Sequence, residues 1–116
     1  MPHIRLEHSA NISEKDGMLP LLKKIHTVLV ETLPADLATC KSRVFECPVF
    51  CVSDGAQQNA FVHLGIHILP GRTQETIEQT KVALINLLKS HFVQSSKDLH
   101  LSLSVEIALL GEYIKG

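Results

Sequence analysis

The chain has 116 residues, of which 45% are apolar and 20% charged, and its net charge is −1. This length fits a single domain with a modest core. With four Phe, one Tyr and no Trp, that core must be aliphatic, which favours helices packed on a sheet. The scattered Lys and Arg residues exclude the electrostatic footprint of a nucleic-acid-binding protein.

The N-terminus lacks a basic segment followed by an apolar one, and no run of about 18 apolar residues occurs. We therefore expect a cytoplasmic protein with no membrane or nucleic-acid partner. Its partners should be small molecules or further copies of the same chain.

The first half of the chain predicts a strand, a helix and a second strand. Residues 3–8 alternate between apolar and polar, as a half-buried strand does. Ser13 and Asp16 have the spacing of a capping box before a helix over 19–33, with Pro20 in its first turn and Pro34 ending it. Residues 43–52 form an irregular strand, in which Pro48 indicates an edge position or a bulge.

The second half repeats this order. Asp54 and Gly55 predict a turn, and residues 60–69 alternate again. A tight corner at Pro70, Gly71 and Arg72 precedes a helix that Thr73 caps, and residues 101–108 predict the last strand.

These elements indicate an α+β fold built as a duplicated β-α-β unit, with halves at about 2–55 and 56–110 of one domain spanning 1–116. The sheet is expected to be mixed and four-stranded, with two helices on one face. The other face carries apolar residues too, so self-association is the simplest way to cover it.

The histidines and cysteines do not predict a metal site. His63 and His67 share a strand face but stand roughly 13 Å apart, too far for one zinc ion. Cys47 and Cys51 are separated by a similar distance and cannot form a disulfide with each other, so we expect buried or half-buried reduced thiols at these positions and at Cys40. No glycine-rich phosphate loop or G-x-S-x-G motif occurs, and we expect no cofactor.

Two positions could carry chemistry. If Met1 is removed, Pro2 becomes a free secondary amine, and burial or a nearby cation would lower the pKa of such an amine toward neutral pH. Arg72 lies where a strand ends and a helix begins, a common place for anionic ligands in α/β layers. On its own, an arginine there is more often a solvated surface charge, and the same ambiguity holds for Lys41 and Arg43.

Seven short segments together carry a family resemblance. They are Met1-Pro2-His3-Ile4, Ser9-Ala10-Asn11-Ile12, Lys41-Ser42-Arg43-Val44, Ala60-Phe61-Val62-His63, Gly71-Arg72-Thr73, Lys89-Ser90-His91-Phe92 and Ser104-Val105-Glu106-Ile107. In order and spacing they resemble the 5-carboxymethyl-2-hydroxymuconate delta-isomerase family of the tautomerase superfamily, nearly end to end. The resemblance implies a tautomerase-like fold that forms a homotrimer.

The resemblance also implies an activity and its residues. The protein would be a cofactor-independent isomerase that moves a proton within an unsaturated 2-hydroxy or 2-oxo polycarboxylic acid, in the catabolism of homoprotocatechuate. Pro2 would be the general base and Arg72 would bind or polarise the substrate, while Arg43 and Lys41 would bind it. Relatives tend to carry arginine where this chain has Lys41, and the tail beyond Gly111 is shorter than the family pattern.

Two other functions stay open at this point. One is a tautomerase, decarboxylase or hydratase acting on another enol acid, such as a phenylpyruvate-like monoacid, which needs fewer cations. The other is a non-catalytic trimeric binding protein, if Met1 is retained.

Overall fold

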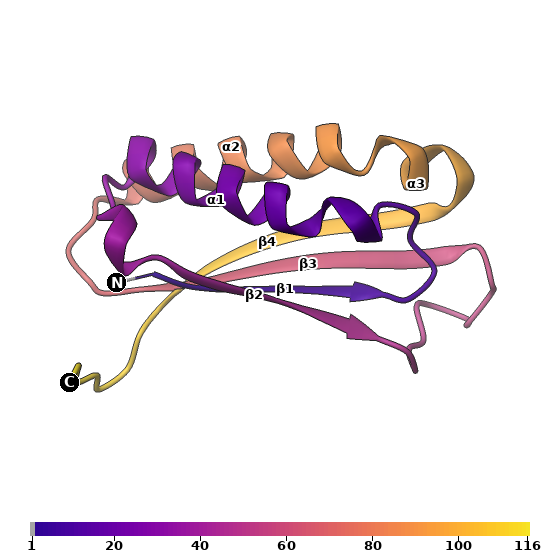
Figure 1. The fold of residues 1–116 in the computed structure, drawn as a ribbon, viewed down its shortest axis with the longest axis horizontal. Coiled ribbons are helices and arrows are strands. Elements are labelled where there is room, and N and C mark those ends of the chain that lie inside the picture. Colours follow the sequence, from indigo (N-terminus) through magenta and orange to yellow (C-terminus); the bar gives the residue numbers. More distant parts are fainter. Residues whose placement is uncertain (1) are drawn as a thin grey trace.

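Four strands form one mixed sheet in the order β2-β1-β3-β4, and the helices cover one of its faces (Figure 1). The computed structural model describes residues 2–116. Its elements are β1 (His3–Ser9), α1 (Met18–Thr32), β2 (Lys41–Cys47), β3 (Asn59–Ile68), α2 (Gln74–His91), α3 (Val93–Asp98) and β4 (His100–Leu109), with 3-10 turns at Lys15–Gly17 and Leu37–Thr39. No helix within the described range is long and apolar enough to cross a membrane.

The two halves repeat the same strand arrangement, which confirms the duplicated β-α-β unit. β1 pairs in parallel with β2, β3 pairs in parallel with β4, and β1 and β3 run antiparallel at the centre. The backbone N–H of Lys41 donates to the Pro2 carbonyl at 3.2 Å, and that of His100 donates to the Gln58 carbonyl at 2.8 Å. The start of each half is therefore built in the same way.

The core lies between the helices and the sheet and is almost wholly aliphatic, as the composition predicts. Phe92 is the one aromatic side chain among the buried hydrophobic residues of the described chain. Burial of each large aliphatic side chain contributes about 1.5–3 kcal/mol. The largest fully buried side chains are Phe92, Ile4, Leu6, Leu21, Ile25, Leu29, Leu64, Ile66, Ile68, Leu84, Leu88 and Val62.

The start of α1 differs from the prediction. Pro20 does lie in the first turn, but the helix begins at Met18, one residue earlier than expected, and no side chain caps it. The predicted capping box of Ser13 and Asp16 is wrong because the backbone N–H of Ser13 donates instead to the Ser95 hydroxyl at 2.9 Å. A contact with a residue 82 positions away replaces the local one.

Glu14 explains this long-range contact. Its carboxylate accepts hydrogen bonds from the Ser95 hydroxyl and, at 3.0 Å, from the Ser95 backbone N–H. That N–H belongs to the first turn of α3, where the helix itself offers no acceptor. Glu14 therefore caps a helix from a distant part of the chain.

The other elements lie close to their predicted positions. Thr73 caps α2 as expected, its hydroxyl accepting from the Thr76 N–H at 3.2 Å. β2 is an edge strand, as Pro48 indicated, but it spans Lys41–Cys47 and ends before that proline rather than reaching residue 52. The turn at Asp54 and Gly55 is present, with Gly55 at φ 82°.

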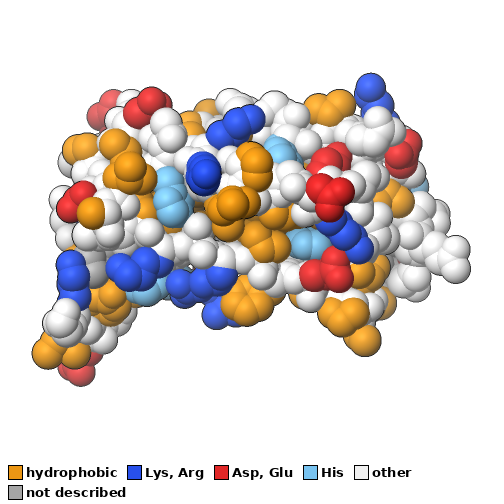
Figure 2. Space-filling model, in the orientation of Figure 1, with side chains coloured by type: hydrophobic (Ala, Val, Ile, Leu, Met, Phe, Trp, Pro, Cys, Tyr) orange, Lys and Arg blue, Asp and Glu red, His pale blue; other side chains and the backbone are white. Residues whose placement is uncertain are grey.

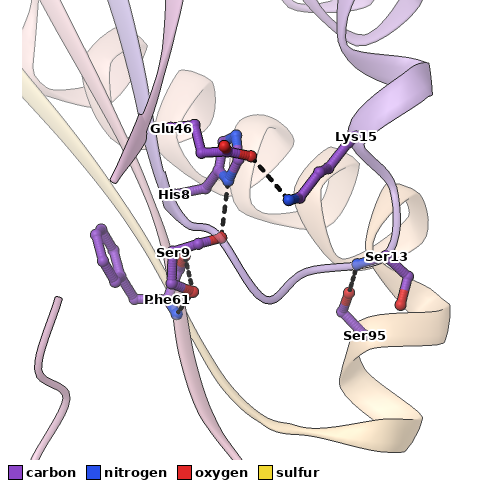
Figure 3. A network of polar contacts seen from close by, with 7 residues as sticks. All are labelled: His8, Ser9, Ser13, Lys15, Glu46, Phe61 and Ser95. Carbon is purple, nitrogen blue, oxygen red and sulfur yellow. Dashed lines mark hydrogen bonds and ion pairs between the residues drawn. The ribbon is translucent and has the colours of Figure 1, made fainter. Parts of the chain in front are cut away.

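A polar network ties the sheet to the entry of α1 at the end of the molecule opposite the N-terminus (Figure 3). Lys15 forms an ion pair with Glu46 of β2 at 2.9 Å. Nδ1 of the buried His8 donates to the Ser9 carbonyl at 2.9 Å, and the Ser9 hydroxyl accepts from the Phe61 N–H at 3.0 Å. These contacts hold the segment that precedes α1 against β2 and join β1 to β3 at this end.

The helix-free face is more polar than predicted. The alternation of the strands places on it Lys41, Arg43, Phe45, His3, Arg5, Glu7, Phe61, His63, Gly65, His67, Ser102, Ser104, Glu106 and Ala108. Phe45 is 41% exposed, and the Arg5 guanidinium lies 4.6 Å from the centre of its ring. Apolar area alone is therefore a weaker argument for self-association than the sequence suggested.

Candidate active site

Pro2 is buried directly before β1, at the end of the sheet where β2 begins and β3 ends. Strand alternation places its ring on the helix side, with Ile4 and Leu6. The expected removal of Met1 concerns a residue outside the described range. Burial is the environment that lowers the pKa of an amine, because it disfavours the charged form.

Arg72 is held at the same end, on the helix side of the sheet. It follows Gly71, whose φ of 126° few residues other than glycine adopt. The Arg72 Nε donates to the Leu33 carbonyl at 3.2 Å and Nη1 to the Leu69 carbonyl at 3.3 Å. Its guanidinium is therefore fixed between the end of α1 and the end of β3, and its other N–H groups remain to bind an anion.

Lys41 and Arg43 lie at this end too, but their side chains project from the helix-free face. The Lys41 Nζ donates to the Thr39 carbonyl at 3.3 Å, and the Arg43 Nη1 donates to Nδ1 of His3 at 3.1 Å. Figure 2 shows Lys and Arg side chains gathered at the lower left, where β2 begins and the C-terminal tail runs. The structure thus brings all four predicted site residues to one end, with Arg72 on one face and the other two cations on the opposite face.

Two residues of this end were not predicted from the sequence. Nε2 of His3 lies 2.9 Å from the hydroxyl of Tyr113, and the two rings meet edge to face. Tyr113 is the single tyrosine of the chain, and that rarity was the only signal available. The tail therefore contacts the site although it is short.

The neighbouring thiol is not an activated nucleophile. Burial, with Asp36 adding to it, raises the pKa of Cys40, so the protonated form prevails at neutral pH. All three cysteines are free. Cys40 and Cys47 are half-buried as predicted, but Cys51 is exposed because it lies in the loop after β2. Within residues 2–116 no group of three or more His, Cys, Asp and Glu side chains could hold a metal ion.

An open cavity of about 620 Å³ lies at the other end of the sheet, lined among others by Gln58, Asn59 and His100. None of the four predicted site residues lines it. The candidate site is therefore identified by the Lys and Arg side chains gathered at one end of the sheet and not by the size of a cavity.

Comparisons with known proteins bear on what this arrangement does. The sequence model of the 5-carboxymethyl-2-hydroxymuconate isomerase family matches residues 2–115. The chain is 35% identical over 107 residues to the 5-carboxymethyl-2-hydroxymuconate Delta-isomerase of Escherichia coli, covering 92% of this chain and 85% of that protein.

The chain belongs to the 5-carboxymethyl-2-hydroxymuconate isomerase family. It is accordingly an isomerase of the tautomerase superfamily. The crystal structure of a 5-carboxymethyl-2-hydroxymuconate isomerase from Deinococcus radiodurans R1 superposes with a TM-score of 0.89 at 29% identity, covering 98% of this chain and 88% of that one.

A more distant structure shares the fold of the isomerase family. It is a symmetric trimer of a wild-type fused 4-OT, with a TM-score of 0.70 at 18% identity, covering 95% of this chain and 85% of that one. At this identity the likeness shows the fold alone.

Proposed function

We propose that the protein converts 5-carboxymethyl-2-hydroxymuconate to 5-carboxy-2-oxohept-3-enedioate in the catabolism of homoprotocatechuate, with Pro2 as the general base. The chain belongs to a family of such isomerases, and the observation that carries this proposal is the place of Pro2 in the fold. Pro2 is buried at the end of the sheet where Arg72, Lys41 and Arg43 also lie. The reaction needs a base near neutral pH and fixed positive charge for an anionic substrate.

The proton and the charge move as follows in this mechanism. The neutral amine of Pro2 takes a proton from the substrate, and the resulting dienolate spreads its negative charge onto oxygen. Arg72, fixed by two backbone carbonyls, stabilises that charge with its remaining N–H groups. The prolinium then returns a proton to carbon at the other end of the conjugated system, which regenerates the base.

The number of cations favours a polycarboxylate over a monoacid. A phenylpyruvate-like enol carries one carboxylate and needs one cation, whereas this end of the chain presents Arg72 on the helix side and Lys41 and Arg43 on the helix-free face. In the proposed trimer, a neighbouring subunit would complete the set of cations around one substrate. We therefore expect a higher kcat/KM for the muconate substrate than for a phenylpyruvate-like monoacid.

The proposed assembly is a homotrimer, as in the fused 4-OT relative of the same fold. The shared fold, rather than apolar area on the largely polar helix-free face, supports this assembly. Light scattering after size exclusion should give about three times the chain mass of 12.8 kDa. A monomer would contradict this part of the proposal.

The decisive experiment compares protein with and without Met1. Intact-mass spectrometry establishes whether Met1 is removed in the native host, and a spectrophotometric assay then follows ketonisation of the dienol. General-base catalysis supplies about 10²- to 10⁴-fold, so Pro2→Ala should lower kcat by at least about 100-fold.

Pro48→Ala is the matched control, because this exposed proline lies beyond the end of β2, away from the site. It should keep wild-type turnover. Retention of Met1 in a fully active native protein, or wild-type turnover by Pro2→Ala, would refute Pro2 as the base.

A further inference from the structure

Three side chains from separate segments form a hydrogen-bonded line on the helix-free face. Arg43 of β2 contacts Nδ1 of His3 of β1 at 3.1 Å, and Nε2 of His3 contacts the hydroxyl of Tyr113 in the C-terminal tail at 2.9 Å. His3 follows Pro2 directly in the chain, and strand alternation places its side chain on the face opposite the Pro2 ring.

Donor and acceptor chemistry fixes the protonation state of His3. An arginine side chain can only donate, so Nδ1 of His3 must be the acceptor and carry no proton. The imidazole is then neutral, with its proton on Nε2, and it donates to the Tyr113 oxygen. A protonated His3 would point an N–H group at the guanidinium and lose this hydrogen bond.

The surroundings of His3 favour the same neutral form. Burial is the main cause that lowers the pKa of His3, followed by the positive charges of Arg43 and Lys41 on β2, with His67 on β3 adding to them. Tyr113 faces the ring from the tail, and Pro2 lies one residue upstream. None of these neighbours is a carboxylate that would favour the imidazolium.

We propose that His3 and Tyr113 are positioning residues for Arg43, holding its guanidinium in place to bind a carboxylate of the substrate. This inference rests on the proposed function and extends it to two residues that make no contact with the reacting atoms. Tyr113 fixes the ring of His3, and the ring offers the acceptor that fixes Arg43.

The expected consequence is an effect on substrate binding rather than on proton transfer. An arginine with a fixed acceptor has fewer conformations to lose when it binds a carboxylate. Loss of the hydrogen-bonded line should therefore raise KM while kcat stays near the wild-type value. This is the pattern for an interaction that is equally strong in the ground and transition states.

Three variants separate the two contacts of the hydrogen-bonded line. Tyr113→Phe removes only the hydroxyl, and His3→Leu removes both hydrogen bonds. His3→Asn retains an amide oxygen near the position of Nδ1 and so keeps an acceptor for Arg43. Ile114→Ala, at a neighbouring tail residue that is 95% exposed, is the matched control.

We expect a KM about five to ten times the wild-type value in His3→Leu, in line with the loss of one hydrogen bond of about 1 kcal/mol, and a smaller rise in Tyr113→Phe. His3→Asn should restore most of the affinity, and Ile114→Ala should behave as the wild type. Because Tyr113 lies in an exposed tail, Tyr113→Phe should fold even if His3→Leu does not.

The pH dependence of KM distinguishes the positioning role from a merely structural one, which would leave it unchanged. As the pH falls and His3 becomes protonated, the wild-type KM should rise, whereas the KM of His3→Asn should lack this dependence because asparagine does not titrate. Equal pH profiles in the two proteins would overturn the positioning role.

The two proposals can fail separately. A Met-free wild type without turnover of the muconate substrate would overturn the proposed function. Normal wild-type turnover with unchanged KM in both Tyr113→Phe and His3→Leu would overturn the positioning role alone.

Discussion

Replacement of Arg72 by alanine should weaken both the fold and the proposed reaction, because the guanidinium that we propose as the oxyanion's partner also binds two backbone carbonyls. The half-buried side chain donates to the carbonyls of Leu33 and Leu69. A hydrogen bond that involves a charged group contributes about 1.5–3 kcal/mol. In the variant, water can donate to the two freed carbonyls, which offsets part of that loss. We expect a loss of about 2 kcal/mol in the free energy of unfolding.

For a chain of this length, that loss corresponds to a decrease in Tm of about 6–10 °C. Circular dichroism at one fixed protomer concentration measures it, since the Tm of an oligomer depends on concentration. Removal of a preorganised donor at a developing oxyanion lowers kcat by about 10²- to 10³-fold. Assays at a temperature below both measured Tm values keep this effect apart from unfolding.

Arg72→Lys tests the geometry of the guanidinium. The ammonium keeps the charge but cannot span two carbonyls and a substrate oxygen as the planar fork does. We expect a Tm close to that of Arg72→Ala and a kcat between alanine and wild type. Lys23→Ala, at an exposed residue of α1, is the control for loss of a positive charge.

A wild-type Tm and kcat in Arg72→Ala would refute both roles of this residue. A lower Tm with normal turnover would leave Arg72 a structural residue only, and the oxyanion would then need another partner.

Three further outcomes follow from the structure. Gly71→Ala places a side chain at φ 126°, so it should cost about 1–3 kcal/mol of stability and reduce turnover by displacing Arg72; an unchanged thermal melt would contradict this. Burial lowers the pKa values of His26 and His91, so below about pH 6.5 the unfolded chain binds more protons than the native one. Urea titrations should show lower stability at pH 5.5 than at pH 7.5, and equal values would count against this reasoning. Lys41→Arg supplies a bidentate donor for a carboxylate, so steady-state kinetics should give a lower KM for the muconate substrate, and a higher one would speak against a binding role.

The sequence predicted β1, β3, β4 and α2 well because their apolar periodicity reports directly on one buried face, whereas β2, which lacks such a regular alternation, ends five residues before its predicted end. Pro20 and Pro34 located α1 to within one residue for a similarly local reason, since proline lacks the N–H group that a helix interior requires. Thr73 was identified as a cap because a threonine directly before a helix can accept from a backbone N–H three residues later, here that of Thr76.

The capping box at Ser13 failed because the residue that binds the Ser13 N–H and the Glu14 carboxylate, Ser95, comes from far along the chain. Ser95 and Glu14 are 81 positions apart, and no local pattern can show that they meet. The same limit applies to the site: topology alone brings Pro2 and Arg72 to one end of the sheet. The contact of Tyr113 with His3 depends on how a tail without regular structure folds back.

The repeated architecture has a consequence for how many bases one chain can supply. Each half opens with the same backbone hydrogen bond into its parallel partner strand, at Pro2 in the first half and at Gln58 in the second. The cavity at Gln58 and His100 is the internal counterpart of the candidate site. There, however, the nitrogen of residue 58 is part of a peptide bond and cannot accept a proton. Of these two corners, only the one at Pro2 could yield an amine, by removal of Met1, so under the proposed mechanism each chain supplies a single base.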